Sequence, residues 1–442
     1  MYPRHGRHHR TFMILYFDIL IIGAGPAGLS AAAVAAGCGA RVGIVDDNPL
    51  PGGQIWRQGP AHPPAVPARA LLEQLAGHPN VMRLSGTRVV QSLGPGRLLA
   101  EDAQQSLMLG YGKLILATGA RERFLPFPGW TLPGVTGAGG LQALIKGGTP
   151  VRGQRVVMAG SGPLLWAAAA SARAAGARIV AIVEQAPAPA VARFARALVH
   201  TPAKLTQALR LRLGLWQTPY WRGAYVTAAH GDARLDHVTI RRQGRETLVP
   251  CDRLGCAYGL LSNTEVAAAL GCRLDLDAAN ANAPVIAVDA WQASSVADVF
   301  AAGECTGVGG MELAAVEGRI AAYAALGQRD EARRSFPARE RYRQFAARLH
   351  AAFALDPVLR SLARADTLLC RCEDVTFGQA AAHDSWRSAK LHTRCGMGPC
   401  QGKVCGSAAG FCLGWQTPGT QAPRPPFAPA RIDTLMQGES NS

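Results

Sequence analysis

Cysteines gather near the C-terminus in a pattern suited to metal chemistry. The chain has eleven cysteines, and six of them fall within residues 370–412. Cys370 and Cys372 form a CxC pair, and Cys395, Cys400 and Cys405 follow in a glycine-rich stretch after about two dozen helical residues. Thiolates suit zinc or iron–sulfur centres, and two such groups can meet at one centre. Structural zinc usually shows CxxC spacing, which both groups lack. The pattern therefore favours an iron–sulfur cluster, with zinc and unligated cysteines as the alternatives.

A glycine-rich turn near the N-terminus has the spacing of a phosphate-binding loop. The apolar run Asp18–Ile22 leads into Gly23-Ala-Gly25-Pro-Ala-Gly28 and then into an alanine-rich helical stretch. In such a turn Gly23 permits the bend, Gly25 lets the backbone approach a pyrophosphate and Gly28 lets the helix pack on the strand. Asp46 ends the next apolar run, about 20 residues on, where a carboxylate can accept ribose hydroxyls. We predict a dinucleotide site here; the alternative is a plain strand–turn–helix connection.

Residues 151–184 repeat this pattern. The second turn has Gly160 and Gly162, but Leu165 stands at the third glycine position, and the following apolar run ends on Glu184. An acid at that place suits an unphosphorylated ribose, as in NADH. The repeat predicts a second dinucleotide unit, which either binds NAD(H) or another adenine nucleotide or is an unoccupied structural relic.

Three further loops follow apolar strands and are expected beside the first site. Each combines small residues that expose the backbone with a polar or acidic group. They are Gly53-Gln54 within PGGQ, Thr118-Gly119 after the strand 113–117, and Gly303-Glu304 after the strand 298–302. A helix over 311–326 follows the last loop, so its N-terminus would lie near phosphate or ribitol groups.

Composition limits the function classes. The chain has 442 residues, 48% of them hydrophobic, and a net charge of +16. Its positive charge is mostly scattered arginine and only 6% of residues are aromatic, which disfavours nucleic acid and favours anionic cofactors. Contact with a membrane surface or a quinone stays open. The basic N-terminus lacks the pattern of a signal peptide, and the apolar stretch 163–183 contains two arginines, so we expect a cytoplasmic protein, peripheral at most to the inner face of the membrane.

These observations predict an α/β protein with a discontinuous first unit. The expected parts are a basic extension (1–16, with the true start at Met1 or Met13), a first dinucleotide unit (17–120 and 250–330), a second dinucleotide unit (121–249), a helical linker (331–366), a small cysteine domain (367–415) and a proline-rich tail (416–442). Residues 81–112 alternate polar and apolar positions and predict an antiparallel meander. The tail is expected to be flexible or to bind a partner.

The ordered set of motifs resembles the flavoproteins of the glutathione and thioredoxin reductase superfamily. The shared features are both glycine turns, Asp46, PGGQ, the ATG of 117–119 and the AAGE of 301–304. This resemblance implies two Rossmann-like domains of that type and FAD at the first site. It does not imply disulfide reduction, because residues 1–330 contain no CxxC. Glu304 also replaces the aspartate usual in the superfamily.

The cysteine segment resembles the 2Fe–2S domain related to bacterioferritin-associated ferredoxin. In that pattern CRCE supplies Cys370 and Cys372, and GMGPCQGKVC supplies Cys400 and Cys405. Cys395 is then a surplus thiol and the rival ligand, while Cys412 is expected in the core. Glycines 396, 398 and 402 are expected to offer backbone N–H groups to the cluster.

The combination of both parts is similar to the accessory flavoproteins of heteromeric amine and imino-acid dehydrogenases. That group includes the A subunit of opine oxidase, the alpha subunit of D-hydroxyproline dehydrogenase and the B subunit of hydrogen cyanide synthase. The resemblance implies an electron-transfer role beside a catalytic flavin-dependent subunit, with a small ferredoxin-like subunit as a further candidate partner. The alternatives are a stand-alone NADH:acceptor reductase and a nucleotide-binding scaffold without a redox flavin. No catalytic acid, base or nucleophile is assigned, because His200, His350 and the other histidines are isolated in sequence.

Overall fold

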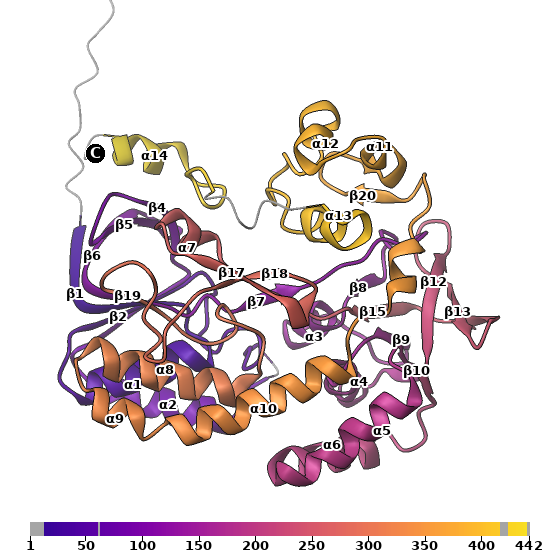
Figure 1. The fold of residues 1–442 in the computed structure, drawn as a ribbon, viewed down its shortest axis with the longest axis horizontal. Helices are drawn as coiled ribbons and strands as arrows, with labels where there is room; N and C mark the ends of the chain where they lie inside the picture. Colours follow the sequence, from indigo (N-terminus) through magenta and orange to yellow (C-terminus); the bar gives the residue numbers. More distant parts are fainter. Residues whose placement is uncertain (1–12, 61, 416–422, 440–442) are drawn as a thin grey trace, which may run out of the picture.

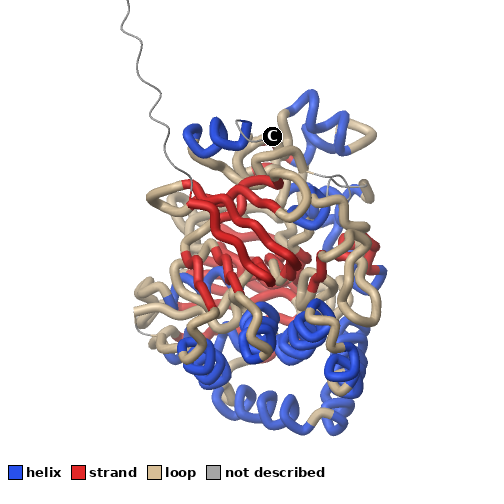
Figure 2. The backbone as a smooth tube through the Cα atoms, turned by 90° about the vertical axis from the view of Figure 1, so that its left-hand side faces the viewer, coloured by secondary structure: helices blue, strands red, loops and turns tan. Residues whose placement is uncertain are grey.

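The computed structural model describes residues 13–60, 62–415 and 423–439, and it confirms a mixed α/β architecture. Two sheets lie side by side, each with helices packed against it, and a small helical unit lies above them (Figure 1). The view turned by 90° shows helices packed outside the central strands (Figure 2).

The first sheet carries the N-terminal glycine turn. Its strand order is β3-β2-β1-β6-β5-β4, with β19 paired to β6. The strands are β1 (Met13–Ile22), β2 (Val42–Asp46), β3 (Val81–Ser85), β4 (Arg88–Ser92), β5 (Arg97–Glu101), β6 (Ser106–Leu116) and β19 (Val299–Ala301). Because β1 pairs in parallel with β2 and β6, the loops after these strands meet at one edge of the sheet.

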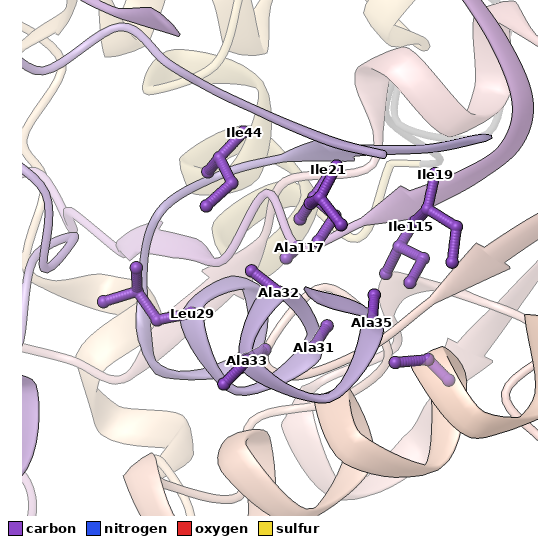
Figure 3. Close-up of a cluster of buried hydrophobic side chains, with 14 of the residues drawn as sticks. Ile19, Ile21, Leu29, Ala31, Ala32, Ala33, Ala35, Ile44, Ile115 and Ala117 are labelled. Carbon is purple, nitrogen blue, oxygen red and sulfur yellow. The ribbon is translucent and has the colours of Figure 1, made fainter. Parts of the chain in front are cut away.

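Small residues bring two helices close to this sheet. Helices α1 (Pro26–Gly37) and α8 (Met311–Ala325) pack against each other beside the strands, and α2 (Val66–Ala76) contacts α1. Figure 3 shows strand isoleucines meeting the alanines of α1; the labelled set includes Ile19, Ile21, Ile115, Ala32 and Ala35. Since alanine carries only a methyl group, the helix axis approaches the sheet closely and the glycine turn is held rigidly.

Two local predictions for this unit need correction. The first strand begins at Met13 rather than Asp18, so residues 13–16 of the predicted extension belong to the sheet, and its remaining residues, 1–12, lie outside the described residues. The meander is antiparallel over β4, β5 and β6, but β3 pairs in parallel with β2. Short alternating strands do not show their pairing direction, because side chains alternate in both kinds of sheet.

The second sheet has the order β11-β10-β9-β15-β8. Its strands are β8 (Val135–Gly137), β9 (Arg155–Gly160), β10 (Arg178–Glu184), β11 (Tyr220–Arg222) and β15 (Arg253–Ala257). Helices α3 (Ala138–Lys146) and α4 (Leu164–Ala174) pack on it, and the hairpins of β12 (Ala224–His230), β13 (His237–Arg242) and β14 (Arg245–Pro250) adjoin it. β15 pairs here, whereas the sequence placed residues from 250 onwards with the first unit.

Shorter elements connect the two units. β7 (Ala120–Glu122) pairs with β16 (Leu260–Ser262), and β17 (Leu274–Asp277) pairs with β18 (Ala283–Ile286). The helices are α5 (Ala188–Ala197), α6 (Pro202–Gly214), α7 (Glu265–Ala269), α9 (Arg329–Arg333) and α10 (Phe336–Ala352). In Figure 1 α10 runs from α8 in the first unit towards α5 in the second, and it contacts both.

The cysteine segment forms its own small core. It comprises β20 (Leu368–Cys370), β21 (Val375–Thr376), α11 (Phe377–Ala381), α12 (Trp386–Thr393) and α13 (Cys405–Leu413). Thr376 and Gln379 form a reciprocal capping box at the start of α11, which fixes the chain directly after the first cysteine pair. Trp386 and three of the cysteines are buried in this core.

The proline-rich C-terminal stretch packs on the first unit. Phe427 is buried against the first sheet, and its backbone N–H donates to the carbonyl of Val90. The helix α14 (Ile432–Glu439) follows, with the hydroxyls of Thr434 and Ser106 hydrogen-bonded at 2.8 Å. Residues 423–439 are therefore packed rather than a flexible tail, because proline-rich composition does not reveal a single buried aromatic anchor. The partner-binding role stays a prediction, and residues 416–422 and 440–442 of the predicted tail lie outside the described residues. Across the described residues no helix is long and apolar enough to cross a membrane.

Candidate functional site

The three glycines of the first turn meet different surroundings. Gly23 has φ of +108°, and a Cβ there would lie 2.2 Å from the carbonyl oxygen of Ala117. A Cβ on Gly28 would lie 1.8 Å from the carbonyl oxygen of Gly23, so the helix and the turn are in direct contact. Gly25 is different, because only the Cα of Gly53, at 3.9 Å, lies within 4 Å of the place for its Cβ. The middle glycine therefore leaves open space, where a ligand can approach the backbone.

Asp46 holds this turn beside the neighbouring loop. One carboxylate oxygen accepts a hydrogen bond from the backbone N–H of Ala24 at 2.6 Å, and the other accepts from the backbone N–H of Asn48 at 2.8 Å. Asp46 is 8% exposed, and that exposed part faces a cleft. The side-chain amide of Asn48 also donates to the second oxygen, at 2.7 Å. A carboxylate has more acceptor positions than these three bonds use, so it can still receive ribose hydroxyls.

The cleft has a volume of about 630 Å³ and begins at the edge of the first sheet. Its walls include most of the residues predicted for the first dinucleotide site: Gly23, Gly25, Asp46, Gly53, Gln54, Thr118, Gly119 and Glu304. The predicted Gly28 and Gly303 serve packing instead, since a Cβ on Gly303 would lie 2.8 Å from the Cβ of Ala27. Residues that no sequence motif indicated also line the cleft: Arg121, Glu122, Gln142, Asn263, Lys403 and Phe427.

Two acidic side chains in the wall of the cleft have pKa values above the ordinary value. Burial raises the pKa of Glu304, although the backbone N–H of Gly310 acts in the opposite direction. Burial also raises the pKa of Glu122, whose two oxygens accept from the N–H groups of Gly139 and Gly140 at 2.7 and 2.8 Å. Each carboxylate is thus held at the N-terminal end of a helix, where the helix dipole favours negative charge.

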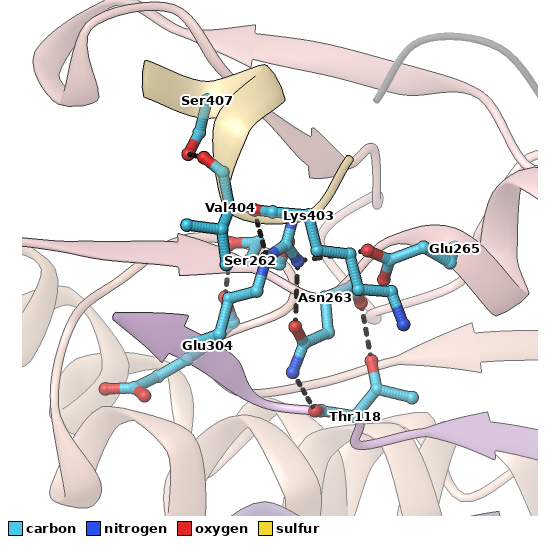
Figure 4. Close-up of polar contacts among 9 residues, drawn as sticks. Thr118, Ser262, Asn263, Glu265, Glu304, Lys403, Val404 and Ser407 are labelled. Carbon is cyan, nitrogen blue, oxygen red and sulfur yellow. Dashed lines mark hydrogen bonds and ion pairs between the residues drawn. The ribbon is translucent and has the colours of Figure 1, made fainter. Parts of the chain in front are cut away.

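A hydrogen-bond network joins the cleft to the cysteine unit (Figure 4). Asn263 donates from its side chain to the carbonyl of Thr118 at 2.9 Å, and the Thr118 hydroxyl donates to the Asn263 carbonyl at 2.7 Å. The guanidinium of Arg121 donates to the Asn263 side-chain oxygen at 2.9 Å and pairs with Glu265 at 3.0 Å. It also donates to the backbone carbonyl of Lys403 at 3.4 Å. Arg121 belongs to no sequence motif, and its position soon after the strand 113–117 was the one signal that could have indicated it.

Five cysteines come together in the C-terminal unit. The sulfur atoms of Cys370, Cys395 and Cys405 all lie within 4.8 Å of one another, and all three side chains are buried. The sulfurs of Cys372 and Cys400 lie 3.8 Å apart on the more exposed side. The structure thus brings together both predicted pairs, and Cys395 lies among them. Cys412 is only partly buried and packs with the core of the second unit.

Backbone N–H groups surround these thiols. Burial alone would raise the pKa of Cys400, but the N–H groups of Val404, Gly402 and Lys403 and the neighbouring Cys372 lower it below its ordinary value. Burial raises the pKa of Cys370, and the N–H of Gly396 opposes that effect. Gly398 packs closely against a cysteine, since a Cβ there would lie 2.3 Å from the Cβ of Cys372.

The thiol of Cys405 also has a raised pKa. Its pKa is raised first by the hydrogen bond with Cys395 and then by burial, while a hydrogen bond with Cys370 acts in the opposite direction. Thiolates packed this closely would repel one another. A cation bound between them offsets this repulsion and allows several of these cysteines to ionise together.

The second glycine turn has a different environment. Gly160 has φ of +138° and contacts the carbonyl of Ala257. One oxygen of Glu184 accepts from the N–H of Gly162 at 2.8 Å, and the other accepts from the N–H of Ala186 at 2.9 Å. Burial raises the pKa of Glu184 to about 7. Gly160, Gly162 and Glu184 are absent from the walls of the 630 Å³ cleft, and the Leu165 side chain is fully buried.

Comparison with known proteins agrees with this geometry. The family described as pyridine nucleotide-disulphide oxidoreductase matches residues 17–321. The A subunit of opine oxidase from Rhizobium meliloti is 36% identical over 424 residues, which are 88% of this chain and 90% of that protein. Hydrogen cyanide synthase subunit HcnB of Pseudomonas aeruginosa is 34% identical over 430 residues, or 89% and 91% of the two chains.

Among solved structures, the L-proline dehydrogenase of P. horikoshii has a similar fold. It superposes with a TM-score of 0.67 at 16% identity, covering 97% of this chain and 81% of that chain. At this identity the likeness concerns the fold alone. It extends over nearly the whole chain, beyond the two sheets that the family match covers.

Proposed function

Because the chain belongs to the pyridine nucleotide-disulphide oxidoreductase family, and is thus a flavin-dependent oxidoreductase, we propose a specific role for it. It is the electron-transfer subunit, carrying FAD and a 2Fe–2S cluster, of a heteromeric amine or imino-acid dehydrogenase or oxidase. The substrate class comes from its relatives, which are subunits of opine oxidase and hydrogen cyanide synthase. The chain would then work beside a catalytic flavin-dependent subunit that oxidises a C–N bond, and a small ferredoxin-like subunit is a further candidate partner.

The observation that carries this proposal is the contact between the cysteine group and the nucleotide cleft. Lys403 lies between Cys400 and Cys405 in sequence and also lines the cleft. Its backbone carbonyl accepts from Arg121, which follows Thr118-Gly119 in the same wall. A redox centre held by these cysteines would be a neighbour of a flavin in the cleft, as electron hopping requires.

The residues present fit both groups. The open space at Gly25 and the N-terminus of α1 suit a pyrophosphate, while Asp46 suits the ribose. Glu304, which is hydrogen-bonded to the N–H of Gly310 just before α8 and lines the cleft, suits the ribitol hydroxyls. FAD, when bound, supplies the ability to take up an electron pair and release single electrons. The residues named here would bind and orient it, and the buried thiols keep water from the inner side of the cysteine group.

For the cluster we propose the ligands Cys370, Cys372, Cys400 and Cys405, with Cys395 as the rival. The first four occupy both sides of the group, since Cys370 and Cys405 are buried while Cys372 and Cys400 reach the surface. The N–H groups of Gly396 and Gly402 point at two of these sulfurs and would tune a cluster's potential.

The test is an anaerobic absorbance and EPR spectrum of the purified full chain, recorded before and after NADH and then after dithionite. Flavin bands, together with a rhombic 2Fe–2S signal that needs dithionite, are expected. Rapid bleaching of the flavin by NADH would instead support a stand-alone NADH:acceptor reductase. A colourless, EPR-silent protein would support the nucleotide-binding scaffold, and zinc in it would contradict the iron–sulfur assignment.

A further inference from the structure

The two glycine turns differ in what faces their middle glycine. At Gly25 the nearest atom to the place of an added methyl group is a backbone Cα at 3.9 Å, and the space beyond opens into the cleft. At Gly162 the corresponding place faces the side chain of Phe353, with its ring carbon at 3.8 Å and its Cβ at 3.9 Å. An aromatic side chain of the same chain therefore lies where a pyrophosphate would approach the second turn.

Phe353 belongs to a segment that is hydrogen-bonded to the second glycine turn and to the residue after Glu184. We define residues 353–356 as the covering segment; it follows directly after α10. The hydroxyl of Ser161 donates to the backbone carbonyl of Phe353 at 2.9 Å. The side chain of Gln185 donates to the carbonyl of Ala354 at 2.9 Å and accepts from the N–H of Asp356 at 3.0 Å. The first residue of the covering segment is thus hydrogen-bonded to the second turn, and Ala354 and Asp356 are hydrogen-bonded to Gln185, the residue after Glu184.

Apolar packing and buried polar contacts strengthen this closure. The ring of Phe353 packs edge-on against Phe194 of α5, with ring centres 5.1 Å apart. Gln185 also donates to the hydroxyl of Ser161 at 2.8 Å, and both side chains are buried. Moving the covering segment away would break the hydrogen bonds that Ser161 and Gln185 make with it, which opposes opening.

The carboxylate expected to bind a ribose is out of reach. Glu184 is only 1% exposed, and both of its oxygens already accept backbone N–H groups. Asp46, at the equivalent place in the first unit, makes similar backbone bonds but lines the 630 Å³ cleft. The difference between the two sites therefore lies in the covering segment and in access, since both acids make the same kind of backbone contact.

We infer that the covering segment closes the second dinucleotide site of this chain and decides its choice of electron donor. NADH cannot bind beside Gly162 and Glu184 while Phe353, Ser161 and Gln185 hold their positions. This inference goes beyond the proposed function. It stands whether or not the cysteine group carries a cluster, and it concerns only the second glycine turn.

The test is calorimetric titration of the purified full chain with NADH and with ADP-ribose. The opened variant is Phe353→Ala/Gln185→Ala, which removes the ring over Gly162 and the side chain that holds the segment. The matched control is Phe345→Ala, because Phe345 packs on the same Phe194 ring, at 5.9 Å, but is not among the atoms near Gly162. Flavin absorbance of each protein reports separately on the first site.

The wild type and Phe345→Ala are expected to show no saturation up to about 1 mM of either nucleotide. The opened variant should bind both at least tenfold more tightly, with unchanged flavin content. Micromolar binding by the wild type would overturn the inference. An opened variant that retains its flavin and still fails to bind would overturn it as well, because the turn itself and not the segment would then exclude the nucleotide. Neither result bears on whether the chain holds a flavin and a 2Fe–2S cluster, which absorbance and the dithionite-reduced EPR spectrum decide separately.

Discussion

The sulfur atoms of Cys372 and Cys400 lie 3.8 Å apart although the two cysteines are 28 positions apart in sequence. The contact joins the CxC pair to the Cx4C pair, and it lies at the surface side of a group whose other members are buried. Two cysteines at this distance either bind the same metal centre or are liable to oxidation. Their chemistry can therefore be tested directly.

Substituting either surface cysteine should remove the cluster. For Cys372→Ser or Cys400→Ser, bound iron in the purified chain is expected to fall at least about tenfold, since even changes beyond the ligands cost metal sites that much. Iron and acid-labile sulfide are measured per chain. Cys412→Ser is the matched control, because this cysteine packs with the second unit, and it should keep its full iron content. Full iron in both surface variants would remove them from the ligand set.

Cys395 distinguishes two ligand sets. Its sulfur lies within 4.8 Å of both Cys370 and Cys405, so distance alone allows it to replace one of them. With the ligands proposed above, Cys395→Ser should retain iron and shift the EPR signal only slightly, whereas Cys370→Ser and Cys405→Ser should lose the cluster. Loss of iron in Cys395→Ser together with retention in Cys370→Ser would instead make Cys395 the fourth ligand.

Substitutions at two glycines of the first turn should have different effects, one on ligand binding and the other on stability. Gly25 has φ of −81°, which alanine adopts readily, and its methyl group would enter open space, so Gly25→Ala should leave the melting temperature nearly unchanged. It should weaken FAD binding at least about tenfold, because the methyl group occupies the pyrophosphate position. Gly28→Ala should cost about 1–3 kcal/mol of stability, since its Cβ would lie 1.8 Å from a carbonyl oxygen.

Thermal melting and FAD titration of both glycine variants provide the check. Wild-type affinity for FAD in Gly25→Ala would place the pyrophosphate elsewhere. A similar loss of stability in both variants would mean that the turn has no room at Gly25.

Stability should depend on pH through Glu184. Burial raises the pKa of this carboxyl from 4.5 to about 7 in the folded protein, so the folded state holds the proton more tightly than the unfolded chain. Its contribution is therefore fully present below about pH 4.5 and is lost as the pH rises to about 7. The loss of folding stability between these two pH values amounts to up to about 3 kcal/mol.

The measurement compares the melting temperatures of the wild type and Glu184→Gln between pH 5 and 8. The wild type should lose stability relative to the variant as the pH rises to about 7, and the difference should then stay constant. Glu246→Gln, on an exposed hairpin, is the control and should show a constant difference throughout. A constant difference for Glu184→Gln would show that this carboxyl is ionised over the whole range.

Local sequence patterns predicted those parts of this protein whose conformation depends on residues close by in the sequence. The spacing of Gly23, Gly25 and Gly28 indicated a strand–turn–helix unit, because a positive φ and a close helix contact each require glycine at a fixed place. Regular apolar runs indicated the parallel strands, and the cysteine spacing indicated that distant thiols would meet. These features need only short stretches of sequence to specify them.

Other features follow from contacts between distant segments, which no local pattern records. Phe427, in a stretch that looked flexible, is buried against the first sheet and lines the cleft. Strand β15 joins the second sheet, and Arg121 links the cleft to Lys403 across 282 positions of sequence. Each depends on where whole units pack, which is decided by shape and burial over the entire chain.

Residue order alone specifies two glycine turns, two acids at equivalent strand ends and a gathering of thiols. The difference in access between the two equivalent turns arises in the folded chain. Asp46 faces an open cleft, whereas Gly162 is covered by Phe353, which lies 192 positions along the chain from its bonded partner Ser161. This division arises because a turn's backbone geometry is set by its own residues, while its accessibility is set by whichever distant segment packs over it.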